Sequence, residues 1–181
     1  YADEIAYNNH DIDDGYRSGV IKFKALMDIS LFRESAELVK KDYSDIDEIR
    51  WLHETIRRII YNLIFDICET SAINLAKFKP KTIKEVRIFP QLICLSKEMA
   101  DKQIELKQFL RTFLYQHERV IIMTNNAKKI MKDLFLHFIN DPSLMPKSYQ
   151  NNSEQDLART VADYLAGMTD RYAIKVHKDI K

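Results

Sequence analysis

Scarcity of glycine and proline is the feature that most restricts the fold of this chain. The 181 residues include three glycines and four prolines, and nearly all of them fall between apolar segments rather than within them. Both residue types are unfavourable inside helices and typical of turns, so this placement favours long uninterrupted helices. No alternation typical of strands and no internal repeat interrupts the helical spacing of the apolar residues. The sequence therefore predicts an all-α fold.

The first half of the chain is expected to form three helices. The first covers residues 2–12 and ends towards Gly15, and a shorter one covers residues 30–41. A long third helix is expected to reach about residue 76, with Ser44 as its N-cap, because a serine oxygen can accept from the free N–H groups of a first turn. Its apolar stripe consists of Ile49, Leu52, Ile56, Ile59, Leu63 and Ile67.

The second half is expected to be helical beyond an irregular connection over residues 77–95. Ser96 is expected to cap a helix that carries Phe113, and a further helix carries Phe138 until Asp141 and Pro142 stop it. A polar loop over residues 141–152 then precedes a last helical region. Its expected boundary residues are Ser153 and Asp156 at the start, Gly167 at an interruption and Thr169 at a second cap.

Charge and cysteine content exclude several classes of protein. The net charge is +1, with 28 Lys and Arg against 27 Asp and Glu, so no overall field attracts nucleic acid or a membrane. Cys68 and Cys94 lie outside any metal-ligand spacing, which disfavours a disulfide scaffold and a zinc ribbon. We expect no membrane-spanning segment and no signal peptide. The length suits a single all-α unit over residues 1–181, in a reducing cytoplasm.

The stretch ADEIAYNNHDIDDG, residues 2–15, gathers carboxylates on one side of its expected helix. Asp3, Tyr7 and Asp11 follow one another at four-residue steps, so they share one face. Two interpretations remain open. The stripe could face water near a helix N-terminus, where the macrodipole favours acids. It could instead line a pocket in which one carboxylate binds a divalent cation, another accepts from substrate hydroxyls and the tyrosine ring stacks on the ligand.

The pair His10 and Asp11 invites a direct metal interpretation, which we do not adopt. Adjacent helical residues point about 100° apart, and one pair supplies too few ligands for a stable site. The other histidines lie far apart in the sequence and are expected at the surface or at helix ends. They are His53, His117, His137 and His177.

Two motifs at opposite ends of the chain carry a family resemblance. The run ADEIAYNNHDIDDGYRSG resembles the segment with the last metal-ligand aspartate of bacterial deoxyguanosine triphosphate triphosphohydrolases, which are dNTP triphosphohydrolases of the HD superfamily. The run DYLAGMTDRYA, residues 163–173, resembles the C-terminal signature of that family, and LKQFLRTFLYQHERV fits the helix between. The resemblance implies the C-terminal portion of an HD-type fold, with long antiparallel helices.

The same resemblance implies roles for particular residues. Asp3 matches the aspartate that completes a His, His-Asp, Asp site for a divalent cation, Mg²⁺ or Mn²⁺. Tyr7 matches a tyrosine that closes against C2′ of the deoxyribose, and Asp11 matches an aspartate that accepts from the 3′-hydroxyl. Arg57 matches an arginine that binds the triphosphate of the substrate in the family, and Arg58 is nearly as good a match.

Near the C-terminal signature, Arg171 and Arg159 are expected either to face substrate or to form a salt bridge that holds the last helix. Both interpretations stay open at this point. The substrate-binding set that the resemblance favours is Tyr7, Asp11, Arg57 and Arg171, with Asp3 as metal ligand.

The reaction implied by the resemblance is attack of a metal-organised water on the α-phosphorus of a dNTP, with dGTP favoured, releasing deoxynucleoside and tripolyphosphate. The upstream His and His-Asp ligands of the family are absent from this sequence. The chain is therefore expected to be the C-terminal half of such an enzyme, inactive alone, whose partners are the N-terminal half and further copies in a homo-oligomer. The alternative is a non-catalytic helical module for assembly or regulation. A cavity lined by Asp3, Tyr7 and Asp11, and exposed apolar residues on the early helices, would favour the enzyme.

Overall fold

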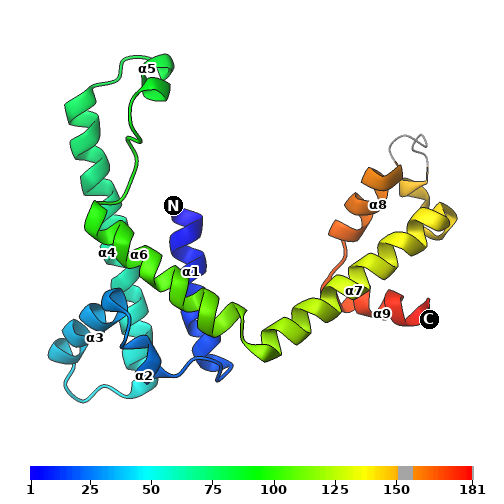
Figure 1. Cartoon of the computed structure of the whole chain (residues 1–181), viewed down its shortest axis with the longest axis horizontal. Helices are drawn as coiled ribbons and strands as arrows, with labels where there is room; N and C mark the ends of the chain where they lie inside the picture. Colours follow the sequence, from blue (N-terminus) through cyan, green and yellow to red (C-terminus); the bar gives the residue numbers. More distant parts are fainter. Residues whose placement is uncertain (151–156, 181) are drawn as a thin grey trace. The chain divides into compact units, whose positions relative to one another are not determined.

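The computed structural model describes residues 1–150 and 157–180, which form helices joined by turns and loops without any strand (Figure 1). The prediction of an all-α fold is confirmed. The helices group into two compact units, Tyr1–His117 and Glu118–Lys181, each with its own apolar core. That residues 1–181 act as one unit of a larger domain stays a prediction.

The first unit is built around a long helix, α4, against which α1 and α3 pack. Tyr16 near the end of α1 contacts Glu48 at the start of α4, and Asp13 contacts His53 further along, so α1 and α4 run antiparallel. The helices of this unit are α1 (Ala2–Arg17), α2 (Phe23–Leu26), α3 (Ser30–Asp42), α4 (Glu48–Phe78), α5 (Ile83–Ile88), α6 (Lys97–Leu110) and the π-helical turn η1 (Arg111–Tyr115).

Two helix boundaries differ from the prediction. Helix α1 continues through Gly15 to Arg17, because Gly15 is held inside the helix by packing: a Cβ there would lie 2.6 Å from Cδ1 of Ile21. The prediction of Ser44 as the N-cap of α4 is wrong. Asp47 takes that position, and its carboxylate accepts from the Arg50 backbone N–H at 3.0 Å. Aspartate caps as well as serine, and Asp47 directly precedes the first helical residue.

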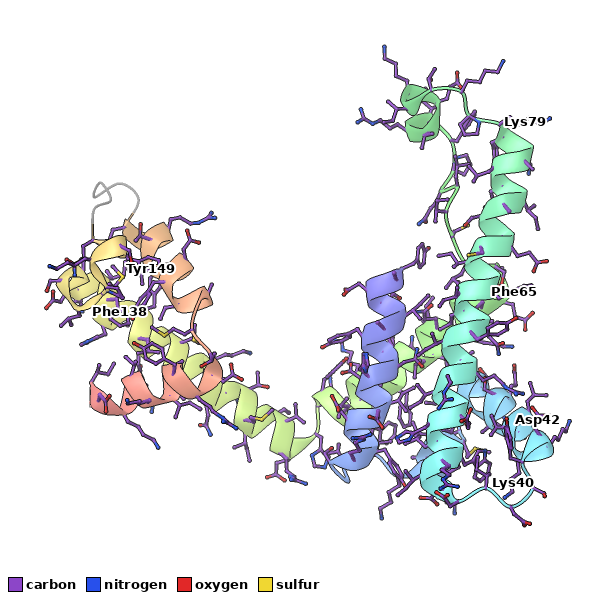
Figure 2. All side chains as sticks on the ribbon, turned by 180° about the vertical axis from the view of Figure 1, so that it is seen from behind. Lys40, Asp42, Phe65, Lys79, Phe138 and Tyr149 are labelled. Carbon is purple, nitrogen blue, oxygen red and sulfur yellow. The ribbon has the colours of Figure 1, made fainter. Side chains whose placement is uncertain are left out.

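The apolar stripe of α4 is only partly buried. Leu52, Ile59 and Leu63 lie in the core, whereas Ile49 is exposed. The distal half of the helix, where Figure 2 labels Phe65, carries exposed apolar side chains, which are Tyr61, Ile64, Phe65, Ile73 and Leu75.

Although we expected no membrane-spanning segment, α4 is long and apolar enough to span a membrane by length and composition. Its mean hydropathy reaches 1.2 over 18 residues, of which 17% are buried. One helix of this kind is weak evidence for a membrane protein, because core helices of soluble proteins meet the same criterion.

The connection over residues 77–95 contains the short helix α5, which lies beyond the end of α4 in Figure 1. Lys79, in the left-handed conformation with φ 44°, ends α4, and the rings of Phe78 and Phe89 pack 5.2 Å apart across the connection. Ser96 then caps α6 by accepting from the Met99 N–H at 3.2 Å, as predicted.

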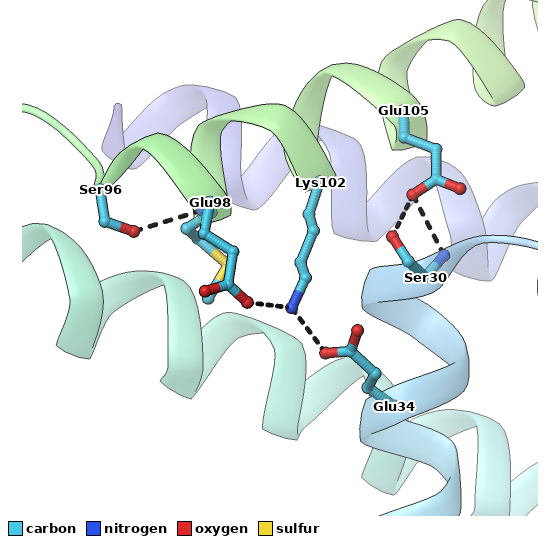
Figure 3. A network of polar contacts seen from close by, with 7 residues as sticks. Ser30, Glu34, Ser96, Glu98, Lys102 and Glu105 are labelled. Atoms are coloured by element: carbon cyan, nitrogen blue, oxygen red, sulfur yellow. Dashed lines mark hydrogen bonds and ion pairs between the residues drawn. The ribbon is translucent and has the colours of Figure 1, made fainter.

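A polar network ties α6 to α3 (Figure 3). The ammonium group of Lys102 lies 2.7 Å from carboxylate oxygens of both Glu34 on α3 and Glu98 on its own helix. Near the start of α3, Ser30 donates through its hydroxyl and its backbone N–H to Glu105. These contacts fix the side of α6 that faces α3 and leave another side to face α1.

The second unit comprises α7 (Glu118–Asn140), the 3₁₀ turns η2 (Pro142–Leu144) and η3 (Lys147–Tyr149), α8 (Leu157–Ala166) and α9 (Asp170–Asp179). In its core Tyr164 packs against Phe138 and Tyr149 with ring centroids 5.2 and 5.0 Å apart (Figure 2). The stop at Asp141 and the cap at Thr169 are confirmed. The predicted start at Ser153 and Asp156 lies outside the described residues.

Candidate functional site

One face of α1 lies along α6 and its continuation η1, in a matched register. Near the start of α1, Glu4 forms an ion pair with Lys107, and eight residues beyond Asp3 the carboxylate of Asp11 accepts from the Tyr115 hydroxyl. The residue numbers of the contacting pairs increase together along both segments, so α1 runs in the same direction as α6 and η1 at this contact. The acidic and phenolic stripe of α1 thereby faces a basic and phenolic stripe of α6 and η1.

Between these stripes is a pocket of about 620 Å³. Two of the predicted site residues, Asp3 and Tyr7, line it, so the interpretation of that face as a pocket wall is favoured over a purely solvated stripe. Asp11 is absent from the lining but is bonded to Tyr115, which does line it. The lining residues are Asp3, Glu4, Tyr7, Asn8, Lys107, Leu110, Arg111, Tyr115 and Gln116.

The pocket contains both signs of charge. Asp3 and Glu4 are on the α1 side, and Lys107 and Arg111 are on the other. Lys107 is paired with Glu4, whereas no ion pair within the described residues involves Arg111. A guanidinium group without a carboxylate partner is suited to binding an anionic ligand through its planar donors.

The hydroxyl of Tyr115 donates a hydrogen bond to Asp11, and Tyr7, the other predicted sugar-contacting group, lines the same pocket as Tyr115. Burial raises the pKa of the Asp11 carboxyl, and the hydrogen bond from Tyr115 opposes that rise. Burial, followed by the bond to Asp11, raises the pKa of the Tyr115 phenol far above its ordinary value, so the phenol keeps its proton. Tyr7 is 57% exposed and available to a ligand.

Asn8, next to Tyr7 in the same wall, is a further polar group at this pocket. Its side chain is only 5% exposed, and its amide nitrogen has no hydrogen-bond partner among the described residues. Buried amide groups in proteins nearly always form hydrogen bonds, so an Asn8 amide nitrogen without a partner among the described residues is unusual.

Sequence reasoning missed the opposite wall of the pocket. Lys107, Arg111 and Tyr115 also follow one another at four-residue steps, which was a readable signal. What the sequence could not provide is the pairing of this stripe with α1, since the two are separated by about a hundred residues, a distance in sequence at which local patterns carry no information about contact.

The described residues do not form a metal site by themselves. No group of three or more His, Cys, Asp or Glu side chains in residues 1–150 and 157–180 is arranged to hold a metal ion. Asp3 can supply one carboxylate ligand, which is too few for stable binding. His10 lines another pocket, together with His53.

Comparison with known proteins now gives the family context. Residues 93–179 match the phosphohydrolase-associated domain, HD_assoc. The chain is 43% identical, over 177 residues or 98% of its length, to a deoxyguanosinetriphosphate triphosphohydrolase-like protein of Bordetella pertussis. Proteins of the same name from Ralstonia pickettii and Nitrosomonas europaea are 44% identical over 99% of the chain and 42% identical over 98%. The chain is a homologue of these triphosphohydrolase-like proteins.

The resemblance inferred from the two end motifs is thereby confirmed. The chain spans about half the length of the curated relatives it matches, with 46 to 47% of each relative covered. The activity of a whole protein of this family is accordingly a matter for proposal.

Among the described residues, Arg57 does not line the pocket of Asp3 and Tyr7. It lines two other pockets, one of which, about 310 Å³ in volume, also includes His10 and Arg17 on a different side of α1. Its guanidinium lies 3.2 Å from Glu54.

Arg58, the other candidate for the triphosphate, pairs at 2.6 Å with Asp42, which is labelled in Figure 2. That carboxylate lies at the end of α3 and outside the pocket of Asp3. The arginine is therefore engaged in joining α4 to α3.

Arg171 lies on α9 in the second unit and is exposed. Arg159, which flanks the C-terminal signature, forms an ion pair with Asp163 one helical turn away, at 3.0 Å. For Arg159 the structure favours the salt-bridge interpretation, since both groups belong to α8. The substrate-binding role of Arg171 stays a prediction.

Proposed function

We propose that this chain forms part of a dNTP triphosphohydrolase, with dGTP as the favoured substrate, and that the pocket between α1 and α6 binds the sugar and polyphosphate of the nucleotide. The observation that carries the proposal is the shared pocket of Asp3, Tyr7, Lys107 and Arg111. It combines a possible metal ligand, an aromatic ring and two cations. The names of the relatives support the same class of substrate.

The basic wall of the pocket suits a polyphosphate. Arg111 can bind phosphate oxygens through two parallel N–H donors, and Lys107 contributes a point charge. Negative charge that accumulates on a leaving tripolyphosphate is stabilised by such fixed cations in a pocket that partly excludes water. Glu4 holds Lys107 in place until an anion arrives.

The α1 wall suits a deoxyribose. The exposed ring of Tyr7 can pack on the C2′ side of the sugar, where an additional hydroxyl would meet it. Asp11 has two carboxylate oxygens, of which Tyr115 occupies one. The other can accept from the 3′-hydroxyl.

A divalent cation, Mg²⁺ or Mn²⁺, would receive one ligand from Asp3 and the others from residues outside this chain. Such an ion lowers the pKa of bound water and neutralises phosphate charge. Because the described residues do not complete the site, we expect the chain alone to be inactive and to need the N-terminal half typical of its relatives.

A homo-oligomer, a cytoplasmic location and substrate contacts by Arg57 and Arg171 remain part of the proposal. The exposed apolar side chains on the distal half of α4 support a missing partner surface, because soluble proteins rarely leave such groups uncovered. The same observation also favours the second candidate function, a non-catalytic module for assembly or regulation.

Substitution of Asp3 tests the proposal. In a protein that joins this chain to the remaining half, we expect Asp3→Ala to lower bound divalent metal and to reduce dGTP turnover by about a hundredfold or more, because one carboxylate ligand is lost. Metal content by atomic emission and tripolyphosphate release are the measurements.

Asp163→Ala is the matched control, because this carboxylate pairs only within α8 according to the described contacts. It should leave both readouts within about twofold of the parent, as surface pairs contribute little. Unchanged metal content and turnover in Asp3→Ala would exclude the enzyme site and favour the non-catalytic module.

A further inference from the structure

We propose that the basic tip, defined as residues 77–91, is a docking surface for an anionic lipid bilayer. The tip comprises the last residues of α4, the short helix α5 beyond them and the chain that leads back from α5 (Figure 1). Figure 2 labels Lys79 at the point where α4 ends and the tip turns. The inference goes beyond the proposed function, because it concerns where the protein is held and not what it hydrolyses.

The basic tip concentrates a positive charge that the chain as a whole does not show. Its residues include five cations and a single acid, Glu85, so they carry a net charge of +4 against +1 for all 181 residues. The cations are Lys77, Lys79, Lys81, Lys84 and Arg87. All five are exposed, and none forms an ion pair among the described residues. Clusters of about four to eight Lys and Arg are typical of segments that bind anionic lipid headgroups.

The same segment presents the most exposed large apolar side chains of the described residues. Ile88 is 80% exposed and Ile83 is 71% exposed, and Val86, one turn beyond Ile83, is exposed as well. At a bilayer surface such aliphatic groups insert between the headgroups while neighbouring cations contact the phosphates. The combination of cations and aliphatic groups on one short helix therefore favours a lipid surface as the partner.

Local contacts hold the basic tip in shape. Thr82 caps α5 by accepting from the Glu85 N–H at 3.3 Å, and the Glu85 carboxylate accepts from the Lys81 N–H at 2.7 Å. The one acid of the tip is thus bonded to the backbone rather than to an ammonium group. At the base of the tip the rings of Phe78 and Phe89 pack 5.2 Å apart. A segment ordered in this way loses less conformational entropy when it binds a surface.

Single-stranded nucleic acid is the main alternative partner for a basic segment. Proteins that bind it without sequence preference stack its bases on aromatic side chains. The two aromatic rings of the tip, Phe78 and Phe89, pack against each other instead, and the Lys77 ammonium lies 5.2 Å from the centroid of the Phe78 ring. The most exposed groups, Ile83 and Ile88, are aliphatic and offer no stacking surface. These observations favour lipid, and nucleic acid becomes an outcome of the test.

Vesicle co-sedimentation tests the proposal on the protein that joins this chain to the remaining half typical of its relatives. We compare vesicles of phosphatidylcholine alone with vesicles of phosphatidylcholine and phosphatidylglycerol in equal parts. The protein should bind the anionic vesicles and leave the neutral ones unbound. Binding should weaken as added salt screens the attraction between the cations and the headgroups.

Two double variants separate the contributions of charge and of apolar insertion. Lys84→Gln with Arg87→Gln should lower the partition coefficient on anionic vesicles about twentyfold, because each cation near the surface contributes a factor of about five. Ile83→Ser with Ile88→Ser should lower it about tenfold or more, since two aliphatic side chains no longer insert. The apolar variant should keep the salt dependence of the parent, whereas the charge variant should lose much of it.

Matched controls carry the same substitutions elsewhere in the first unit. Lys22→Gln with Lys24→Gln removes two exposed cations at α2, and Ile49→Ser removes an exposed isoleucine at the start of α4. Both should keep the partition coefficient within about twofold of the parent. Every variant should retain the helix content and the dGTP turnover of the parent in solution, because none of these residues lines the pocket of Asp3.

The outcomes distinguish the lipid surface from the other partners. Equal binding to neutral and anionic vesicles, or full binding by both double variants, would overturn the proposal. So would an absence of vesicle binding. In that case, weaker binding of a single-stranded DNA oligonucleotide by the charge variant would assign the basic tip to nucleic acid. A smaller assembly of the apolar variant in analytical ultracentrifugation would assign it to an interface between copies. Failure of dGTP hydrolysis would overturn the proposed function and leave the vesicle result unaffected.

Discussion

Gly15 illustrates how a single residue can be read wrongly from the sequence. Glycine near the end of an apolar pattern usually marks a helix end, yet α1 continues for another two residues. The reason is a long-range contact, because Ile21 returns after a turn and packs on the bare Cα. Its backbone N–H also donates to the Gly15 carbonyl at 2.9 Å.

Gly15→Ala is expected to destabilise the chain by about 1 kcal/mol. Alanine gains about 1 kcal/mol in helix propensity, but its Cβ overpacks the side chain of Ile21, which is stiff and almost fully buried, at a typical cost of about 1 to 3 kcal/mol. Denaturant unfolding measures the difference. With Ile21→Val, which removes the clashing Cδ1, the alanine should be neutral or stabilising. A more stable single variant would show that Ile21 yields to the added methyl group.

The candidate site was predictable from the sequence to the extent that it depends on one helix. Spacing alone placed Asp3 and Tyr7 on one face, and the structure puts both in one pocket. Arg57 was matched through a resemblance, but the sequence around it does not indicate which side of α1 it approaches. Lys107 and Arg111 required knowledge of helix pairing, which local patterns do not contain.

At the scale of the helices, Lys102 is one of the polar connections between α6 and α3, beside the contact of Ser30 with Glu105 (Figure 3). Hydrogen bonds to Glu34 and then to Glu98 raise the pKa of its ammonium group above the ordinary 10.5, and burial opposes them. The charged form is thus favoured in the folded state. Its contribution to stability is fully present below pH 10.5 and is lost as the pH rises through the raised pKa of the folded state.

Lys102→Met is expected to lower the free energy of unfolding by about 1 kcal/mol at neutral pH, since two partly exposed ion pairs are lost. The difference from the parent should shrink as the pH passes 10.5. Denaturation at a series of pH values measures it. Lys97→Met, at an exposed position of the same helix, should leave stability nearly unchanged throughout. A difference that instead grows with pH would mean that the pKa of Lys102 is lowered, not raised, by folding.

Three helix boundaries were predictable because a single nearby side chain decides each of them. Ser96, Asp141 and Thr169 each accept from a backbone N–H two or three residues ahead, so the signal lies within one turn. Ser44 failed because Asp47 offers the same chemistry three residues later. The turn η1 was not predicted, since its residues fit a continuous α-helix equally well.

At the scale of the whole molecule, the chain has two apolar cores rather than one. Leu63 lies in the first and Leu134 in the second, both almost completely buried. Trp51, the single tryptophan, belongs to the first unit, where its indole N–H donates to the Ala36 carbonyl at 2.8 Å. Tryptophan fluorescence therefore reports on one core alone.

Leucine truncations in the two cores should give different signals. We expect Leu63→Ala to lower the stability seen by Trp51 fluorescence by about 2 to 5 kcal/mol, because a buried side chain is replaced by a cavity. Leu134→Ala should shift the transition seen by far-ultraviolet circular dichroism and leave the fluorescence midpoint unchanged. A common shift in both signals for Leu134→Ala would mean that the two cores unfold as one cooperative unit.

The π turn at Arg111–Tyr115 also bears on how natural variants of this chain should be compared. A deletion of one residue there would restore a regular helix and leave helix content nearly the same, while rotating every later side chain of the segment by about 100°. Length changes of a single residue in this stretch would thus alter which side chains line the pocket without disturbing the helical scaffold. The count of residues between Lys107 and Tyr115 is as informative about a relative as the identity of either residue.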